Sequence, residues 1–302
     1  MAKFKFSVMA AALTDDLRNA PRLARSAGFS GIVFDAYSPR LNLAELSGSG
    51  KRDFRHLLSA QDQQLAALSV DIGAKGISLG ADIDRVIARL DTAMETAIGL
   101  GTKLITVDLG PLPAPPPQQP KPQKKINPDE AGLIILPPPS MGAVEGAAPP
   151  EPISGPTDPD ATGAIDAALY EIGQRADRYG VTNAFRSDLA SFAALERAIK
   201  SASCPWFGVD LDPVAILRDA WPIDDIFSCL GGLIRHVRGR DAVRGADRRT
   251  RPAPIGRGSV NWGEFLAKLD EAGYQGWLTI DSLELQDRAA AAQAALEHLR
   301  KL

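Results

Sequence analysis

Eight short apolar segments alternate with helix-patterned segments along the chain, and this alternation constrains the fold more than any other feature. Strict alternation of strands and helices predicts a parallel sheet, and eight strand–helix units are the number that closes a barrel. We therefore predict a single (β/α)8 TIM barrel over residues 1–302. Its strands are expected at residues 4–10, 32–35, 65–72, 104–108, 181–185, 206–211, 234–238 and 277–280.

The helix predicted over 82–99 has the clearest pattern, because its apolar residues form a continuous stripe at helical spacing. Asp15 or Asp16 is expected to cap the helix after the first strand. A doubly wound open sheet is the alternative fold, but no Gly-x-Gly-x-x-Gly follows that strand. Further helices are expected near 51–62, 161–179, 188–202, 214–230, 262–272 and 287–302.

One segment, residues 111–159, interrupts the alternation after strand four. It holds 16 of the 23 prolines, and proline resists both helices and central strands. We predict an extended or disordered proline-rich insertion within the barrel domain. It is either a tolerated surface insertion or a docking or lid segment, because it leaves from the strand end where barrel active sites form.

Composition excludes several classes of protein. A formal net charge of −3 argues against a nucleic-acid partner. The first residues lack the apolar stretch of a signal peptide, and no run of about 18 apolar residues occurs. We therefore expect a cytoplasmic protein with no membrane partner, and the sequence carries no signal for an oligomeric state. The two cysteines, Cys204 and Cys229, are expected to be buried free thiols.

Charged residues mark the carboxyl ends of seven of the eight predicted strands, where a barrel has its active site. Burying unpaired charge is costly, so these groups must pair, bind an ion or open to solvent. This convergence is the main signal for a site. The residues are Asp35, Asp71, Asp108, Arg186, Asp210 or Asp212, Arg238 with Arg240 and Asp241, and Asp281.

The C-terminal half of the chain resembles the xylose-isomerase-like sugar phosphate isomerase/epimerase family. Four stretches carry the resemblance in order and spacing: residues 208–213 (GVDLDP), 236–241 (HVRGRD), 254–262 (PIGRGSVNW) and 272–281 (AGYQGWLTID). The resemblance covers about 1–110 and 160–302 and is looser in the N-terminal half. It implies a barrel that isomerises or epimerises sugars.

The resemblance also implies a divalent metal held by glutamate, aspartate, histidine and glutamate at the ends of strands five to eight. Such a metal would polarise a carbonyl and its neighbouring hydroxyl while the glutamates move a proton between adjacent carbons. In this sequence the matching positions are Arg186, Asp212, Arg238 and Asp281. The chain keeps the aspartate, shortens one glutamate by a methylene, and has arginine at two ligand positions.

Arginine stays protonated in proteins and has no lone pair for a cation. We therefore expect no metal and no cofactor, with Asp212 and Asp281 neutralising Arg186 and Arg238 in ion pairs. Asp212 and Asp281 are the candidate catalytic residues. The candidate ligand-binding residues are Arg186, Arg238, Arg240, Asp241, Asp108 and Asp35, with a small anionic or polyol (sugar-like) molecule as the expected ligand.

Several functions remain open at this point. The chain could be a barrel that performs no chemistry, or an enzyme without the metal in which arginines bind a phosphate or carboxylate and an aspartate is the base. It could also be a binding or scaffold protein, or an active metal-dependent sugar isomerase or epimerase. An enzyme requires an unpaired carboxylate in a closed pocket, whereas a scaffold tolerates complete Arg–Asp pairing.

Three smaller features have structural interpretations. His236 is predicted to point away from Arg238 and to pack against the outer helices. The arginines of the loop after strand seven (Arg244, Arg248, Arg249 and Arg251) are expected in a solvated loop that could close over an anion. Asn261 is a predicted helix N-cap that follows a glycine-rich turn.

Overall fold

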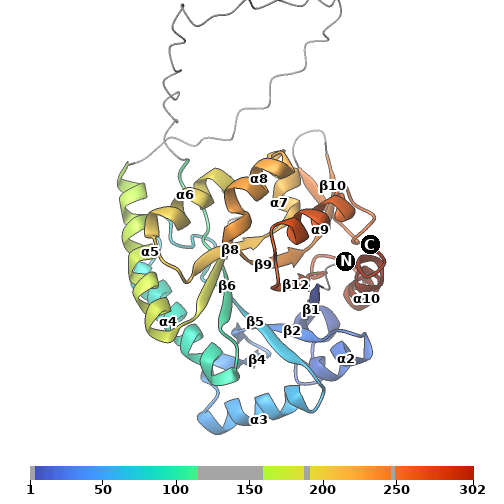
Figure 1. Ribbon diagram of the computed structural model, residues 1–302. Helices are drawn as coiled ribbons and strands as arrows, with labels where there is room; N and C mark the ends of the chain where they lie inside the picture. The colour runs from blue at the N-terminus through green and yellow to red at the C-terminus, as the bar shows by residue number, and fades with distance from the viewer. Residues whose placement is uncertain (1–3, 115–158, 187–190, 246–248) are drawn as a thin grey trace, which may run out of the picture.

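The computed structural model describes residues 4–114, 159–186, 191–245 and 249–302 of the chain. In this part, eight parallel strands form a closed barrel surrounded by helices (Figure 1). The predicted fold is therefore confirmed. The barrel strands are β1 (Lys5–Met9), β2 (Gly31–Asp35), β5 (Gln64–Val70), β6 (Leu104–Asp108), β7 (Thr182–Arg186), β8 (Phe207–Leu211), β9 (Ile234–Gly239) and β12 (Trp277–Ile280).

The strands follow the order β1-β12-β9-β8-β7-β6-β5-β2, and β1 closes the barrel by pairing with both β12 and β2. Val8 of β1 pairs with Ile280 of β12 on one side and with Ile32 of β2 on the other. All three side chains are essentially buried. Each strand is covered on both faces, which explains why the segments read as apolar runs rather than as alternating patterns.

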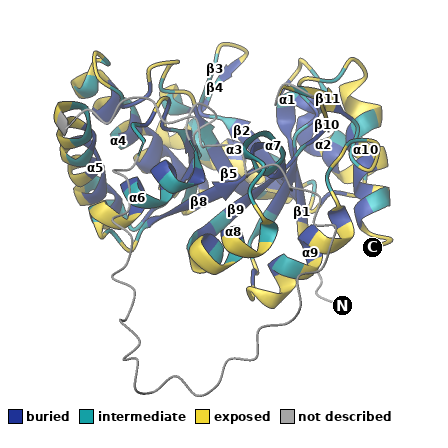
Figure 2. Cartoon of the chain, turned by 90° about the horizontal axis from the view of Figure 1, so that it is seen from above, coloured by how far each residue is buried: buried dark blue, intermediate teal, exposed yellow. Residues whose placement is uncertain are grey.

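The helices form the outer layer, and their exposed faces point away from the buried strands (Figure 2). They are α1 (Ala10–Leu13), α2 (Ala20–Ser26), α3 (Gly48–Ser59), α4 (Ile83–Leu100), α5 (Pro159–Tyr179), α6 (Phe192–Ala202), α7 (Pro213–Asp219), α8 (Ile223–Leu230), α9 (Trp262–Glu271) and α10 (Arg288–Leu299). Two hairpins stand at the strand ends, β3 (Tyr37–Ser38) with β4 (Leu41–Asn42), and β10 (Asp241–Arg244) with β11 (Thr250–Ala253).

Capping residues explain where the best-predicted helices begin and end. Asp82 accepts a hydrogen bond from the amide of Arg85 and starts α4, and Gly101 ends the helix in the left-handed conformation. Asn261 caps α9 through the amide of Glu264, as predicted.

Three local expectations were wrong. Neither Asp15 nor Asp16 caps a helix: the short helix α1 directly follows the first strand, and α2 begins at Ala20 after Asn19, because a bend and a turn lie within residues 14–19. The single helix expected over 214–230 is two helices, since Pro222 between them has no amide donor to continue the first. Cys229 is exposed rather than buried, because it lies on the outer surface of α8.

The proline-rich insertion lies almost wholly outside the described residues, so the prediction of an extended or disordered segment stays a prediction. It leaves the barrel after β6 and rejoins it at α5. Among the described residues, no helix combines the length and the apolar character needed to cross a bilayer.

The loop between β5 and α4 is held against the end of β6 by a close backbone contact. A Cβ atom on Gly76 would lie 1.9 Å from the carbonyl oxygen of Leu109, and Gly76 has a φ of +53°. The amide of the next residue, Ile77, donates to the same Leu109 oxygen at 3.0 Å. Glycine is required here because the two backbones touch.

We expect Gly76→Ala to lower the free energy of unfolding by about 2–4 kcal/mol, because the added methyl group meets backbone and the φ is strained. Urea denaturation followed by circular dichroism measures the change. Gly163→Ala is the matched control: a Cβ atom there meets no atom within 4 Å, so it should change stability by no more than about 1 kcal/mol, in the stabilising direction. Equal behaviour of the two variants would contradict the close-contact argument.

Candidate functional site at the strand ends

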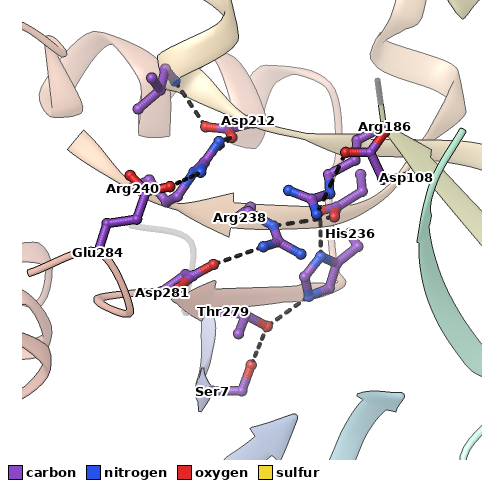
Figure 3. A network of polar contacts seen from close by, with 12 residues as sticks. Ser7, Asp108, Arg186, Asp212, His236, Arg238, Arg240, Thr279, Asp281 and Glu284 are labelled. Atoms are coloured by element: carbon purple, nitrogen blue, oxygen red, sulfur yellow. Dashed lines mark hydrogen bonds and ion pairs between the residues drawn. The ribbon is translucent and has the colours of Figure 1, made fainter. Parts of the chain in front are cut away.

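Charged residues in and just beyond β8, β9 and β12 form a network of polar contacts, in neighbouring groups, at the carboxyl end of the barrel (Figure 3). The network extends inward to the barrel interior and outward to the loops after these strands. Parallel strands deliver their carboxyl ends to one rim, which is why residues far apart in sequence meet here.

The inner part of the network is a chain of short hydrogen bonds. Asp210 Oδ1 lies 2.6 Å from His236 Nδ1, and His236 Nε2 lies 2.6 Å from the Thr279 hydroxyl. Thr279 in turn lies 2.6 Å from the Ser7 hydroxyl. These four residues, on β8, β9, β12 and β1, are at most 1% exposed, so the chain crosses the barrel without contact with solvent.

The prediction that His236 packs against the outer helices was wrong. His236 and Arg238 both face the barrel interior, and both contact Asp210. The reason is the two-residue repeat of a strand: residues two apart share a face, so a regular β9 places these two side chains together.

Arg238 stands between two carboxylates. Its Nη1 donates to Asp281 at 2.7 Å, and its Nε lies 3.5 Å from Asp210 Oδ2. The Arg238 side chain is 7% exposed. Burial lowers the pKa of Arg238, but Asp210 and Asp281 outweigh it and raise the pKa above the ordinary value, so the guanidinium stays charged.

Asp210 is the most constrained acid of the network. Burial by itself raises the pKa of this carboxyl group, but His236 and Arg238 outweigh burial and hold the pKa far below its ordinary value. Asp210 is therefore a carboxylate and a very weak base. A buried charge of this kind persists in a folded protein only when it is paired.

Arg240 is the central residue of the outer part of the network. Its guanidinium forms an ion pair with Asp212, and its Nη1 donates to Glu284 at 3.1 Å. Asp212 also caps α7 by accepting a hydrogen bond from the amide of Val214. Asp212 therefore pairs with Arg240, not with Arg186 as the sequence had predicted, because Arg240 directly follows β9, the strand that pairs with β8.

Arg186 lies at the end of β7, beside Asp108 at the end of β6. Its Nη2 is 3.7 Å from Asp108 Oδ2, and both side chains are partly exposed, at 21% and 32%. The neighbouring strands thus pair Arg186 with Asp108, while Asp281 pairs with Arg238 as predicted.

Asp241 accepts hydrogen bonds from a whole loop. Its carboxylate receives the amides of Ala242, Gly256, Gly258 and Val260 and the indole N–H of Trp262. Five donors occupy the two oxygens, and the residue is 4% exposed. Asp241 holds the segment between β11 and α9 in place, and it also lines the cleft beside Arg240, so its predicted role in ligand binding stays a prediction. A Cβ atom on Gly258 would collide with this carboxylate, which explains the glycine.

Asp35 lies at the end of β2, outside the network of Figure 3. Its Oδ1 accepts the amide of Tyr37 at 2.8 Å. Burial raises the pKa of the Asp35 carboxyl group, and the nearby Asp71 acts in the same direction. Of the loop arginines expected after strand seven, Arg244 and Arg251 lie on the β10–β11 hairpin, and Arg248 is outside the described residues.

A cleft of about 270 Å³ opens beside Arg240, between α7 and the β10–β11 hairpin. Its polar lining includes Arg218, Arg240, Thr250 and Glu284, with Ala215, Val214, Ala242 and Pro252 as the apolar part. This volume is close to that of a small-molecule site. Among the described residues, no group of three or more histidine, cysteine or acidic side chains has the arrangement of a metal site.

Sequence reasoning missed Ser7, Thr279 and Glu284. The first two were detectable: Thr279 lies two residues before Asp281 on the same strand face, and Ser7 lies on the neighbouring strand of the closed barrel. Glu284 carried no signal, because it is beyond the strand end in a loop.

We expect Asp210→Asn to lower the free energy of unfolding by about 3 kcal/mol at neutral pH, because the buried Arg238 guanidinium and the His236 ring lose their carboxylate partner. The folded-state pKa of Asp210 is depressed, so its contribution is complete above the ordinary carboxyl value of 3.8 and is lost as the pH falls. The difference between wild type and variant should therefore shrink below that pH, as measured by urea denaturation across the acid range.

The control for this series is Asp15→Asn, because Asp15 is 76% exposed and pairs with Arg40 at the surface. It should change stability by less than about 1 kcal/mol. A constant difference between wild type and Asp210→Asn at every pH would contradict the assignment of Asp210 as a buried carboxylate.

Solved structures resemble this barrel along its full length. A xylose isomerase domain protein from Planctomyces limnophilus is 16% identical, with a TM-score of 0.68 over 99% of this chain and 96% of that chain. The 3-keto-D-glucoside 4-epimerase of E. coli is 16% identical, with a TM-score of 0.69 over 99% and 100%. D-psicose 3-epimerase from Clostridium cellulolyticum H10 is 14% identical, with a TM-score of 0.70 over 99% of both chains.

At 14–16% sequence identity, the structural likeness shows only the fold. The family is shown by a sequence match to a family model. No curated protein matches the chain significantly. The model of one protein family, the xylose isomerase-like TIM barrel, matches residues 21–302. The chain therefore belongs to the xylose isomerase-like TIM barrel family, whose structural neighbours include sugar epimerases.

Proposed function

We propose that this protein binds a small polyol at the mouth of its barrel and does so without the divalent metal that the family resemblance implies. The proposal depends on one observation. The guanidinium of Arg238 occupies the mouth at the position matched to the family's histidine ligand, 2.7 Å from Asp281, the residue matched to the last glutamate ligand.

The residues present do not fit a divalent cation. Arg238 has no lone pair to donate, and its charge repels a dication. Asp281, the nearest acid matched to a ligand position, is already engaged by Arg238, and Asp212 is engaged by Arg240. A metal would have to break both ion pairs and would find two carboxylates in place of four ligands.

The pairing also favours binding over proton transfer. Asp212 and Asp281, the candidate catalytic acids, each accept from a guanidinium, and Asp210 has a strongly depressed pKa. A general base needs an available lone pair and a pKa near the operating pH. Carboxylates paired in this way are better suited to orienting a ligand than to removing a carbon-bound proton.

The charge of the network favours a neutral ligand at this side of the mouth. Among its described members, five carboxylates face three guanidinium groups: Asp108, Asp210, Asp212, Asp281 and Glu284 against Arg186, Arg238 and Arg240. A polyol satisfies both kinds of group, because each hydroxyl donates to a carboxylate and accepts from a guanidinium. The cleft beside Arg240 has the size and lining for such a molecule.

Several epimerases among the structural neighbours carry sugars in their names, which supports a polyol as the ligand class. The metal-free interpretation separates this chain from the activity that the resemblance implies. Metal-dependent isomerisation would become the favoured function if an ion were found on Asp212 and Asp281.

The first test is metal binding. We expect millimolar Mn²⁺ or Mg²⁺ to leave the melting temperature of the wild-type protein unchanged, because the ligand positions are held by arginine. The comparison variant carries Arg186→Glu, Arg238→His and Asp281→Glu, which rebuilds the family's ligand set and should gain stabilisation by Mn²⁺. Saturable stabilisation of the wild-type protein, or a crystal soaked in Mn²⁺ with an ion on Asp212, would sink the proposal.

The second test is ligand binding. We expect at least one member of a panel of aldoses, ketoses and polyols to raise the melting temperature, since a ligand that binds only the folded state stabilises it. Glu284→Ala should abolish the shift without unfolding the protein, because this side chain is 56% exposed.

Glu297→Ala on α10 is the matched control. Glu297 is also exposed, and its substitution removes the same negative charge at a position away from the cleft. It should retain the full shift. A panel with no stabilising member, or equal loss in both variants, would contradict polyol binding at the cleft.

A further inference from the structure

A second cleft, of about 370 Å³, lies at the end of β5. In the closed barrel, β5 lies across from β9. It is formed by the loop 71–82 and the first turns of α4. Its charged lining residues are Asp71, Lys75, Asp82, Arg85 and Arg89. None of them belongs to the polar network of Figure 3.

Arg89 is held in position by three contacts that leave the end of its side chain available. Its guanidinium stacks 3.5 Å from the centroid of the Tyr37 ring, and its Nε donates to the carbonyl oxygen of Asp71 at 2.6 Å. The Tyr37 hydroxyl donates to the carbonyl oxygen of Arg89 at 2.6 Å. Among the described residues, neither terminal nitrogen of Arg89 has a hydrogen bond or an ion pair.

Two further cations line the same cleft. The Lys75 ammonium donates to the carbonyl oxygen of Gly80 at 3.1 Å, which leaves two of its three donors. Arg85 lies in the first turn of α4 and is exposed. Within the described part of the chain, neither side chain forms an ion pair with an acid.

The acids of the cleft are engaged by the backbone rather than by these cations. Asp71 Oδ1 accepts the amide of Gly73 at 2.8 Å, and Asp82 Oδ1 accepts the amide of Arg85 at 3.1 Å. Asp35 lies within electrostatic range of Arg89 and Asp71 but does not line the cleft. Cations without ion-pair partners therefore face the opening, while the nearby carboxylates hold the loop and the helix start.

The loop that carries the cleft is preformed. Gly76 and Ile77 pin it to the end of β6, and the cation–π stack fixes Arg89 against the β3–β4 hairpin. A preorganised site loses less entropy when it binds. The fork of an arginine, with two parallel N–H donors, matches the oxygens of a phosphate.

We propose that this cleft binds the phosphate group of a phosphorylated sugar or polyol, with Arg89 donating two hydrogen bonds and Arg85 and Lys75 supplying further positive charge. The acid-rich network at the ends of β8, β9 and β12 does not favour an anion, whereas the cations of this cleft, which form no ion pair among the described residues, do. The inference extends the proposed polyol binding but stands on separate residues, so either can fail alone.

The test is titration with inorganic phosphate at constant ionic strength, followed by isothermal titration calorimetry and by the melting temperature. Chloride replaces phosphate in the reference titration. We expect saturable binding to the wild-type protein. Arg89→Ala and Arg85→Ala should weaken it by about tenfold or more, the loss expected for a charge-assisted hydrogen bond.

Arg89→Lys separates charge from geometry, because lysine keeps the positive charge and loses the fork. It should recover less than half of the lost binding free energy. Arg52→Ala is the matched control: Arg52 is exposed on α3, away from the cleft, and the same charge is removed. It should bind phosphate as the wild-type protein does.

Titration with glucose 6-phosphate and with glucose then ties the cleft to the ligand class. Glucose 6-phosphate should bind the wild-type protein more tightly than Arg89→Ala, whereas the affinity for glucose should not change with Arg89→Ala. No saturable phosphate binding, or equal weakening in Arg52→Ala and Arg89→Ala, would overturn the phosphate site. The melting-temperature shift caused by sugars in Glu284→Ala is measured independently. Failure of polyol binding at the cleft beside Arg240 can therefore be distinguished from failure of the phosphate site.

Discussion

The Asp210 carboxylate, buried inside the barrel between His236 and Arg238, is the interaction on which the rest of the site depends. A buried charge must be compensated, and here the compensation comes from the neighbouring strand β9. His236 links Asp210 to Thr279, and Arg238 links it to Asp281. The strands β8, β9 and β12 are therefore joined by side chains as well as by their backbone ladder, and the mouth is built outward from this centre.

The same pairing accounts for the functional proposal. The two arginines that the resemblance matches to metal-ligand positions, Arg186 and Arg238, each lie beside a carboxylate at the end of a neighbouring strand. Such a network positions hydrogen-bond donors and acceptors, and both candidate catalytic acids, Asp212 and Asp281, are engaged in ion pairs within it. Across the mouth, Arg89 and its neighbours form a region where positive charge is not neutralised in this way.

Much of the barrel was predictable because the physical causes are local. Buried parallel strands read as apolar runs, and β12 was predicted at its observed bounds; a continuous apolar stripe marked α4. The Arg238–Asp281 pair followed from matching both residues to adjacent strand ends. The pairing of Asp212 with Arg240 and the five donors on Asp241 were not predictable, because they depend on how far β9 extends and on how a distant loop returns. The orientation of His236 was predictable and was assigned to the wrong face.

By itself the amino-acid sequence determined the number and order of the strand–helix units and the residue types at the strand ends, since periodicity and side-chain chemistry are properties of the chain. Only the tertiary structure decided which charge meets which. Closure of the barrel brings β1 beside β12, and with it Ser7 beside Thr279, 272 positions apart. It also separates Arg89, stacked on Tyr37, from the acids that bind the other arginines. Pairing energies depend steeply on distance and burial, and those two quantities exist only once the chain has folded.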